Sequence, residues 1–449
     1  PPPRLKIAFV SSRFHGNSTE SQMLHGFISR SSAAKSNGFF HVSLWVLGYQ
    51  QEWESDTTFS ELCRRSDDVA FLSNQLREAQ NFLSLKTNAV DVLVFIAPTL
   101  DDPVYWLSHG RYAPVQIAHG AGGGTSGLTA SIDYVLGSDI MTHGNAQFTY
   151  SEQLIRFRGI GLALPPPLLP QIPESARPGY PKQYKYLNGA LFMFANNYYY
   201  FVPHSIMGIL HPIFDKVLCK IIMRNPRAIV LFAAPRGSNI AYERLITRVR
   251  KGLEDSKDQA RLRFLPALSR HEYLSLMAAV DVVLDPYPAS GTGNVYLPSI
   301  EALALGTPVL TLHDDKERKN KPRPSQYPVA AILKSFGEKG EAFVTKSIEE
   351  YIETAVSLPQ WYANNENAHA FKEYLRRKTR DIYVGETLYS DWVVFLKRVA
   401  RMTALKDDND HELKSHPTLP EERVAVIEEL IQGGSKRKIK RKHRKRQQK

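Results

Sequence analysis

Cysteine is scarce in this sequence: its 449 residues include only Cys63 and Cys219. Two thiols cannot form a disulfide framework or a four-thiolate metal site, so we expect buried, reduced side chains in a reducing compartment. Long apolar runs are missing as well. The longest one, from Val90 to Pro98, is about half as long as a membrane-spanning helix requires, so no membrane span is expected.

The first residues contain neither an initiating methionine nor the apolar core of a signal peptide. Because the chain starts at Pro1, we expect it to be an excerpt of a longer protein. No repeat of roughly 30 to 50 residues recurs within the sequence.

The formal net charge of +12 comes mostly from the last fifteen residues, 435–449, which hold ten Lys or Arg and no Asp or Glu. The rest of the chain has 47 basic against 45 acidic residues. Such a run repels itself, so we expect a largely disordered polar and basic tail over 406–449. The tail is a nuclear or nucleolar localisation signal, a non-specific contact with nucleic acid or anionic lipid, or a solvated end without a role. No nucleic-acid-binding motif accompanies it.

The length and an apolar content of 43% fit two or three domains with their own cores. Over residues 1–164, short runs rich in Val, Ile, Leu and Phe alternate with segments compatible with helices. Runs of this kind are typical of parallel strands covered on both faces, in a doubly wound α/β domain. We expect strands in the runs 6–12, 40–48, 68–73, 90–98, 114–120 and 131–139.

A proline-rich linker is expected over 165–187, because seven of the seventeen residues from Pro165 to Pro181 are proline. The alternation then restarts, and 188–405 is predicted to be a second doubly wound domain with closing helices. The expected fold class is therefore α/β, with two Rossmann-like domains facing one another across a cleft. In the second domain we expect strands at 189–197, 228–235, 262–268, 281–288 and 306–312, and helices at 204–223, 240–254, 271–279, 299–305, 348–357, 368–379 and 388–403, with a last helix at 421–432.

A strand, a glycine-rich loop and a helix follow one another between Asp281 and Leu312. Gly291 and Gly293 allow the backbone to approach a ligand closely, and the free N–H groups at the start of the next helix suit a diphosphate. Glu301 lies early in that helix, where its carboxylate either accepts hydrogen bonds from ribose hydroxyls or only complements the helix dipole.

The run from Leu284 to Leu312, LDPYPASGTGNVYLPSIEALALGTPVLTL, resembles the donor-binding signature of glycosyltransferase family 41, which includes the O-GlcNAc and SPINDLY transferases. Other segments similar to the family occur in the same order, and the resemblance covers roughly Leu5 to Ala400. It implies a GT-B fold, a UDP- or GDP-sugar donor and an inverting, metal-independent transfer to protein. These segments are IAFVSSRF (7–14), APVQIAHGAGGGTSGLTASIDYVLGSD (113–139), YSEQL (150–154) and FLPALSRHEYLSLMAAVDVVLD (264–285).

The resemblance also implies three groups of site residues. A donor-binding group combines the glycine-rich loop, two cations and the helix carboxylate: Gly291, Thr292, Gly293, Asn294, Arg236, Arg270 and Glu301. A loop that holds the sugar or the acceptor, or is merely flexible, comprises Gly124, Thr125, Ser126 and Gly127. The catalytic candidates are His15, Asn17 and His119, of which His119 has a structural role as its alternative. Arg236 follows a strand end and so points into the cleft, or is an ordinary loop arginine.

Several positions depart from the family pattern. Asn17 stands where the family has a histidine, with His15 two residues away, and Arg13 replaces an aspartate. Tyr200 stands where a lysine contacts the donor phosphates, and Tyr273 replaces another histidine. Without a metal, cations must stabilise the departing diphosphate, so the loss of that lysine costs activity unless Arg236 or Arg270 compensates.

We therefore predict a protein glycosyltransferase that resembles O-GlcNAc transferase and transfers a sugar, first of all GlcNAc from UDP-GlcNAc, to Ser or Thr. No cofactor and no metal are expected. The expected partners are the nucleotide sugar, protein acceptors and helical repeats upstream of this chain, and the expected location is cytoplasmic, nuclear or both. One alternative is an impaired nucleotide-sugar-binding pseudoenzyme or scaffold. Another is a GT-B hexosyltransferase that acts on lipid or glycan.

Overall fold

The structure of the protein is a computed structural model. It describes residues 4–14, 18–33, 39–48, 57–86, 89–98, 101–120, 125–142, 146–161, 184–186, 191–193, 196–203, 210–234, 240–288, 297–313, 328–362, 365–384 and 386–407. The chain divides into two compact units, Pro1–Tyr389 and Ser390–Lys449. Most of the proline-rich linker, the basic tail and the helix expected at 421–432 lie outside the described residues.

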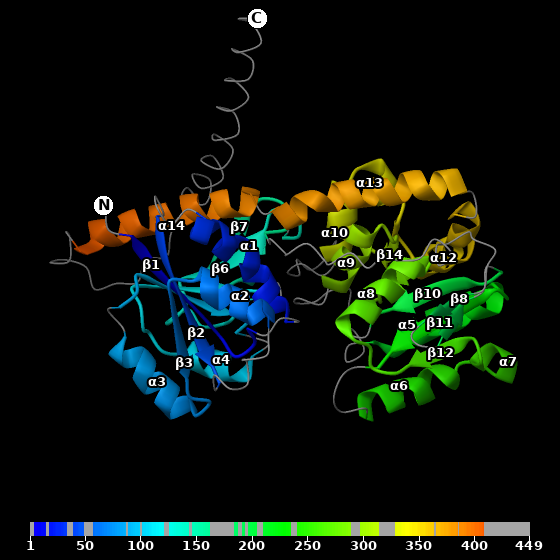
Figure 1. The fold of residues 1–449 in the computed structure, drawn as a ribbon, viewed down its shortest axis with the longest axis horizontal. Coiled ribbons are helices and arrows are strands. Elements are labelled where there is room, and N and C mark those ends of the chain that lie inside the picture. The colour runs from blue at the N-terminus through cyan, green and yellow to red at the C-terminus, as the bar shows by residue number, and fades with distance from the viewer. Residues whose placement is uncertain are drawn as a thin grey trace, which may run out of the picture. The chain divides into compact units, whose positions relative to one another are not determined.

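The first sheet, drawn in blue to cyan in Figure 1, has seven parallel strands, and their order is β3-β2-β1-β4-β5-β6-β7. Six of them occupy the six predicted runs, and β7 was not predicted. Strands β4 and β5 are buried at every residue, which explains why these runs are continuously apolar. The strands are β1 (Leu5–Ser11), β2 (Phe40–Leu47), β3 (Asp68–Leu72), β4 (Val92–Ile96), β5 (Val115–His119), β6 (Tyr134–Ser138) and β7 (Gln153–Phe157), and the helices between them are α1 (Thr19–Ala33), α2 (Thr57–Arg65), α3 (Leu76–Leu85) and α4 (Asp102–Leu107).

The second sheet has six parallel strands in the order β12-β11-β10-β13-β14-β15. In both sheets the strand order reverses beside the first strand: β1 pairs with β2 and β4, and β10 pairs with β11 and β13. Ligands of such sheets bind outside the carboxyl ends of the strands at this switch point. The strands are β10 (Tyr198–Val202), β11 (Ala228–Ala233), β12 (Leu262–Leu265), β13 (Val282–Leu284), β14 (Val309–Leu312) and β15 (Val344–Thr345).

The helices of the second domain follow the expected order. Helix α5 begins later than predicted because His211 is its N-cap and Pro212 its first residue, a position that proline favours. Among the described residues, no helix combines the length and the apolar character needed to cross a membrane. The helices are α5 (Pro212–Arg224), α6 (Ile240–Arg250), α7 (Ser256–Gln259), α8 (Arg270–Ala279), α9 (Leu297–Leu305), α10 (Pro328–Ser335), α11 (Glu338–Glu341), α12 (Ile348–Tyr362), α13 (Asn365–Val384) and α14 (Glu386–Asp407).

One predicted strand is present but belongs to a different sheet. The segment 189–197 does not open the second parallel sheet: β9 (Leu191–Met193) pairs antiparallel with β8 (Tyr184–Tyr186) in a separate two-stranded sheet. The opening strand is the tyrosine-rich β10. All five of its residues are buried, because a tyrosine ring packs as an apolar group when its hydroxyl finds a partner.

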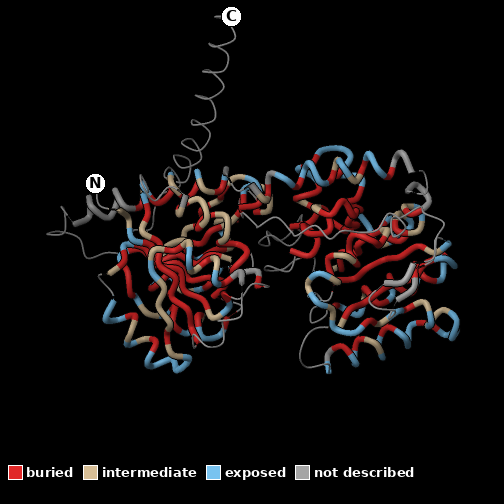
Figure 2. Tube along the Cα trace, in the orientation of Figure 1, coloured by how far each residue is buried: buried red, intermediate tan, exposed pale blue. Residues whose placement is uncertain are grey.

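Alternate residues of β10 enter two different cores, as the period of a strand requires. Tyr198, Tyr200 and Val202 pack in the core that includes residues of α5 and α12. Tyr199 and Phe201 pack in the core that includes residues of α8 and α9. Both faces of the sheet are therefore covered, and Figure 2 shows the buried residues concentrated along the strands of both sheets.

Candidate functional site

Helix α9 carries the predicted donor carboxylate at an unusual place. Eight of its nine residues are buried, so it is a core helix without a solvent face. Glu301 is one of the eight, with 2% of its surface exposed. A carboxylate in such a setting needs a counter-charge, since an unpaired buried charge costs several kcal/mol.

Arg270 supplies that counter-charge. It is the first residue of α8, whose start is fixed by a capping box between Ser269 and Glu272. The guanidinium makes two hydrogen bonds to the Glu301 carboxylate, one of them 3.0 Å long from Nη1 to Oε2. Burial alone would lower the pKa of Arg270, but the adjacent Glu301 carboxylate outweighs this and raises the pKa. The two predicted donor residues are thus brought together as a bidentate ion pair.

The ion pair lies at the edge of the second sheet where ligands of doubly wound folds bind. Arg270 begins the helix that follows β12, and Glu301 is in the second turn of the helix that follows β13. Both helices start at the carboxyl edge of the second sheet, because each follows a parallel strand. The Arg270 side chain is 34% exposed while that of Glu301 is 3% exposed, so the guanidinium is the partner that a ligand can reach.

The G-T-P segment after α9 has a structural role. Gly306 ends the helix with φ +82°, a left-handed conformation. The Arg376 side chain donates a hydrogen bond to the carbonyl of Leu305, the last residue of the helix. The Thr307 hydroxyl donates to the Met277 carbonyl at 2.7 Å, which ties the turn to α8. This part of the signature therefore positions α9 against α8 and the next strand, with no ligand required.

The predicted sugar or acceptor loop is fastened by a carboxylate that the sequence reasoning missed. Buried Glu152 accepts hydrogen bonds from the Thr125 hydroxyl at 2.6 Å, from the Ser126 N–H at 2.8 Å and from the Ser126 hydroxyl. Burial alone would raise the pKa of Glu152, but the bonds from Ser126 and Thr125 hold it below its usual value. Gly127 follows with φ +77°. These donors serve the fold of the loop, and their contact with a ligand stays a prediction; Glu152 itself lies in the segment YSEQL.

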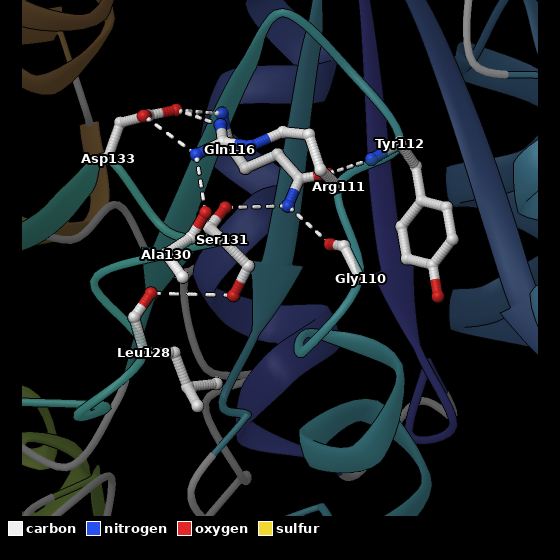
Figure 3. Close-up of polar contacts among 8 residues, drawn as sticks. All are labelled: Gly110, Arg111, Tyr112, Gln116, Leu128, Ala130, Ser131 and Asp133. Atoms are coloured by element: carbon white, nitrogen blue, oxygen red, sulfur yellow. Dashed lines mark hydrogen bonds and ion pairs between the residues drawn. The ribbon is translucent and has the colours of Figure 1, made fainter. Parts of the chain in front are cut away.

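The A-P-V-Q segment, another part of the resemblance, contains Gln116, the centre of a hydrogen-bond network that we call the knot (Figure 3). Gln116 accepts from the Tyr112 N–H at 2.6 Å and donates to the carbonyls of Gly110 and Ser131 at 2.8 and 2.7 Å. Asp133 accepts from the Gln116 N–H at 2.8 Å. These loops precede β5 and β6, so the knot lies at the amino edge of the first sheet, away from the carboxyl edge where ligands bind.

Other candidates are buried. His119 ends β5 inside the domain, and burial lowers its pKa to about 4, so its imidazole is neutral at physiological pH. Tyr200 donates from its hydroxyl to the Ala355 carbonyl at 2.7 Å within the α12 side of the core. Burial raises the Tyr200 pKa far above its ordinary value. Tyr273 packs edge-on against Phe201, with ring centroids 5.5 Å apart. Tyr200 therefore does not supply the cation that the resemblance implies at its position.

One acidic residue that the sequence analysis did not select lies at the carboxyl edge of the first sheet. Asp101 immediately precedes α4 and is 1% exposed. Its Oδ2 atom accepts hydrogen bonds from the N–H and the hydroxyl of Ser12, at 3.0 and 2.7 Å. Ser12 directly follows β1, the strand beside β4 at the switch point. The only signal in the sequence was an aspartate after a strand end, in DDP at the start of a helix.

The remaining site predictions lie outside the described residues: His15, Asn17, Gly124, Arg236, Gly291, Thr292, Gly293 and Asn294. Within the residues that the structure describes, no three His, Cys, Asp or Glu side chains are grouped as metal ligands would be.

Comparison with known proteins bears on the fold. No family model matches this sequence, and no curated protein matches it. Among solved structures, a mutant of the O-GlcNAc transferase from Thermobaculum terrenum is similar with a TM-score of 0.69 and 22% identity, covering 90% of this chain and 69% of that one. The sucrose-phosphate synthase from Thermosynechococcus elongatus is similar with a TM-score of 0.52 and 12% identity, covering 89% of this chain and 100% of that one.

The chain therefore has the GT-B fold, with two Rossmann-like domains, as the sequence predicted. The similarity defines the class by its fold, and the chemistry has to be argued from the residues at the edges of the two sheets.

Proposed function

We propose that this protein is a glycosyltransferase that uses a nucleoside-diphosphate sugar, first of all UDP-GlcNAc, and transfers the sugar to Ser or Thr of proteins with inversion. The observation that carries the proposal is the Arg270–Glu301 ion pair at the carboxyl edge of the second sheet. In a GT-B fold this edge is where a nucleotide is expected to bind.

The accessible charge of the pair suits the diphosphate of a nucleotide. Arg270 keeps N–H groups that do not point at Glu301, and a guanidinium pairs well with phosphate oxygens. The Glu301 carboxylate, whose side chain is 3% exposed, fixes the position of that guanidinium. The pair therefore offers a contact for a diphosphate.

The negative charge that develops during the reaction has to be stabilised by the same cation, Arg270. The acceptor hydroxyl attacks the anomeric carbon while the bond from that carbon to the phosphate oxygen breaks, and the electron pair leaves with the nucleoside diphosphate. One displacement of this kind inverts the configuration. A guanidinium fixed by a buried carboxylate stabilises the departing charge without having to reorganise during the reaction.

Calorimetric titration with UDP, GDP, UDP-GlcNAc and GDP-fucose tests the donor site. Arg270→Ala is expected to weaken binding of the preferred nucleotide about 10- to 100-fold, because a charge-assisted hydrogen bond is lost. Arg224→Ala is the matched control. Arg224 also forms an ion pair with a carboxylate, Glu349, but on the exposed surface of α5, and its loss should leave binding unchanged. Absence of binding to all four ligands by the wild type would refute the proposal.

A nucleotide-sugar-binding pseudoenzyme is the second candidate, and the burial of Tyr200 favours it. At this position the family pattern has a phosphate-binding lysine, whereas the hydroxyl of Tyr200 is bonded inside the core to Ala355. Release of UDP or GDP over time, measured with the best-binding donor and a mixture of protein acceptors, separates the two candidates. Tight donor binding without release would support the pseudoenzyme.

A further inference from the structure

At the carboxyl edge of the first sheet, only one of the two carboxylate oxygens of Asp101 accepts hydrogen bonds from the described residues. The Oδ2 atom of Asp101 is held by Ser12 on both its N–H and its hydroxyl, and lies 3.5 Å from the Ser11 hydroxyl. The Oδ1 atom is equally buried, yet no residue of the described chain donates a hydrogen bond to it. Leaving a buried acceptor unsatisfied costs about 1–3 kcal/mol, and more when it is charged.

A second irregularity lies at the same edge. Ala97, the residue after β4, has φ +49° although it is not glycine. Its N–H donates to the carbonyl of His119 at 2.7 Å, so the strained backbone is held between two strand ends. A non-glycine residue in this region costs about 1–3 kcal/mol, and such residues cluster at functional sites. Strain and an unsatisfied carboxylate oxygen thus occur four residues apart beside the switch point of the sheet.

The chemistry of the Asp101 oxygen selects its ligand. A carboxylate repels phosphate groups, so this edge does not suit the diphosphate of a nucleotide. It accepts a hydrogen bond from a hydroxyl group, and a buried acceptor discriminates strongly in favour of a ligand that supplies the missing donor. The second sheet differs in this respect, because its accessible charge is the Arg270 guanidinium.

We propose that Asp101 is the general base for the acceptor, an inference that rests on the proposed transferase function. Oδ1 accepts the hydrogen bond of the attacking hydroxyl. As the acceptor oxygen bonds to the anomeric carbon, its proton passes to Oδ1, and the nucleoside diphosphate leaves with the electron pair of the broken bond. The two Ser12 bonds hold the carboxylate so that its other oxygen faces the acceptor.

Asp101→Asn tests the base directly. The amide oxygen can still accept both hydrogen bonds from Ser12, so the local fold should persist, but the amide cannot take a proton. We expect single-turnover consumption of the donor to fall about 10²- to 10⁴-fold, as for loss of a general base, while the dissociation constant of the donor changes less than about threefold. Asp101→Glu keeps the charge but shifts it by one methylene, and should fall between wild type and Asp101→Asn.

Asp133→Asn is the control. Asp133 also accepts a backbone N–H bond, from Gln116, but at the amino edge of the same sheet, and its substitution should leave the turnover within about threefold of wild type. Normal turnover of Asp101→Asn would overturn the assignment of Asp101 as the base. A loss of rate that is fully explained by weaker donor binding would also overturn it, because Asp101 would then bind a hydroxyl group of the donor. If Asp101→Asn does not fold, a wild-type rate for Asp101→Glu would overturn it. A wild type that consumes no donor would refute the transferase itself and the base with it.

Discussion

Replacing Arg270 by methionine keeps most of the side-chain volume but leaves the Glu301 carboxylate inside a core helix without its counter-charge. Two hydrogen bonds to a charged group are lost, each worth about 1.5–3 kcal/mol. Together they amount to about 3–6 kcal/mol, and breaking a buried ion pair at one end costs a similar amount, about 3–5 kcal/mol. We therefore expect the free energy of unfolding to fall by about 3–5 kcal/mol.

Replacing Glu301 by glutamine should cost less, roughly 1–2 kcal/mol. The glutamine amide oxygen can still accept from Arg270, and the Arg270 side chain is 34% exposed, so the guanidinium can turn toward water. The asymmetry between the two variants is thus a consequence of their unequal burial, 34% against 3%.

Urea unfolding followed by circular dichroism measures both variants, with the double variant closing the cycle. The double variant should be less destabilised than the sum of the single ones, because it has no unpaired charge. A glutamine variant as destabilised as the methionine variant, or two losses below about 0.5 kcal/mol, would contradict the ion pair as the support of α9.

Gln116→Ala removes three buried hydrogen bonds and should cost about 3–5 kcal/mol in urea unfolding, whereas Gln75→Ala, an exposed glutamine, should cost nearly nothing; equal effects would argue against the knot. Tyr200→Phe loses the bond to Ala355 and should cost about 1 kcal/mol without changing nucleotide affinity in calorimetry; a weaker affinity would show that this residue serves the donor site. His119 has a pKa of about 4, below its ordinary 6.5, so the fold favours the neutral ring and its contribution to stability is present above pH 6.5 and lost as the pH falls toward 4. The free energy of unfolding of the wild type, relative to that of His119→Leu, should therefore fall by roughly 2 kcal/mol from pH 7 to pH 5, and a difference that does not depend on pH would refute the burial of this histidine.

The fold was predictable because most of its strands coincide with continuous apolar runs of the sequence. Strands that are covered on both faces, such as β4, are apolar at successive residues, so the run itself indicates the strand. Strand β10 was not predicted for the opposite reason. Three successive tyrosines do not indicate a buried strand, because a buried hydroxyl needs a partner such as the Ala355 carbonyl that Tyr200 contacts. Strand β15 has two residues, which is too short for any periodic pattern.

The candidate site was predictable only as a set of separate residues. Arg270 and Glu301 were both named as donor residues, and the carboxyl edge to which they belong follows from the order of strands and helices. Their partnership did not follow, because they are thirty-one positions apart and meet only when α8 packs against α9. Glu152 and Asp101 were missed for the same reason: each carboxylate has partners more than twenty residues away.

The sequence by itself determined the class of fold, two successive doubly wound domains, since that depends on patterns of hydrophobicity that repeat within a few residues. It also located the glycine-rich segment and Glu301. Only the tertiary structure decided that the Glu301 carboxylate is buried and paired with Arg270. It also decided that the A-P-V-Q segment connects loops at the amino edge of the first sheet, away from the carboxyl edge where ligands bind. The physical reason is that hydrogen bonding and desolvation of a polar group depend on distant neighbours, whose identity local patterns do not specify.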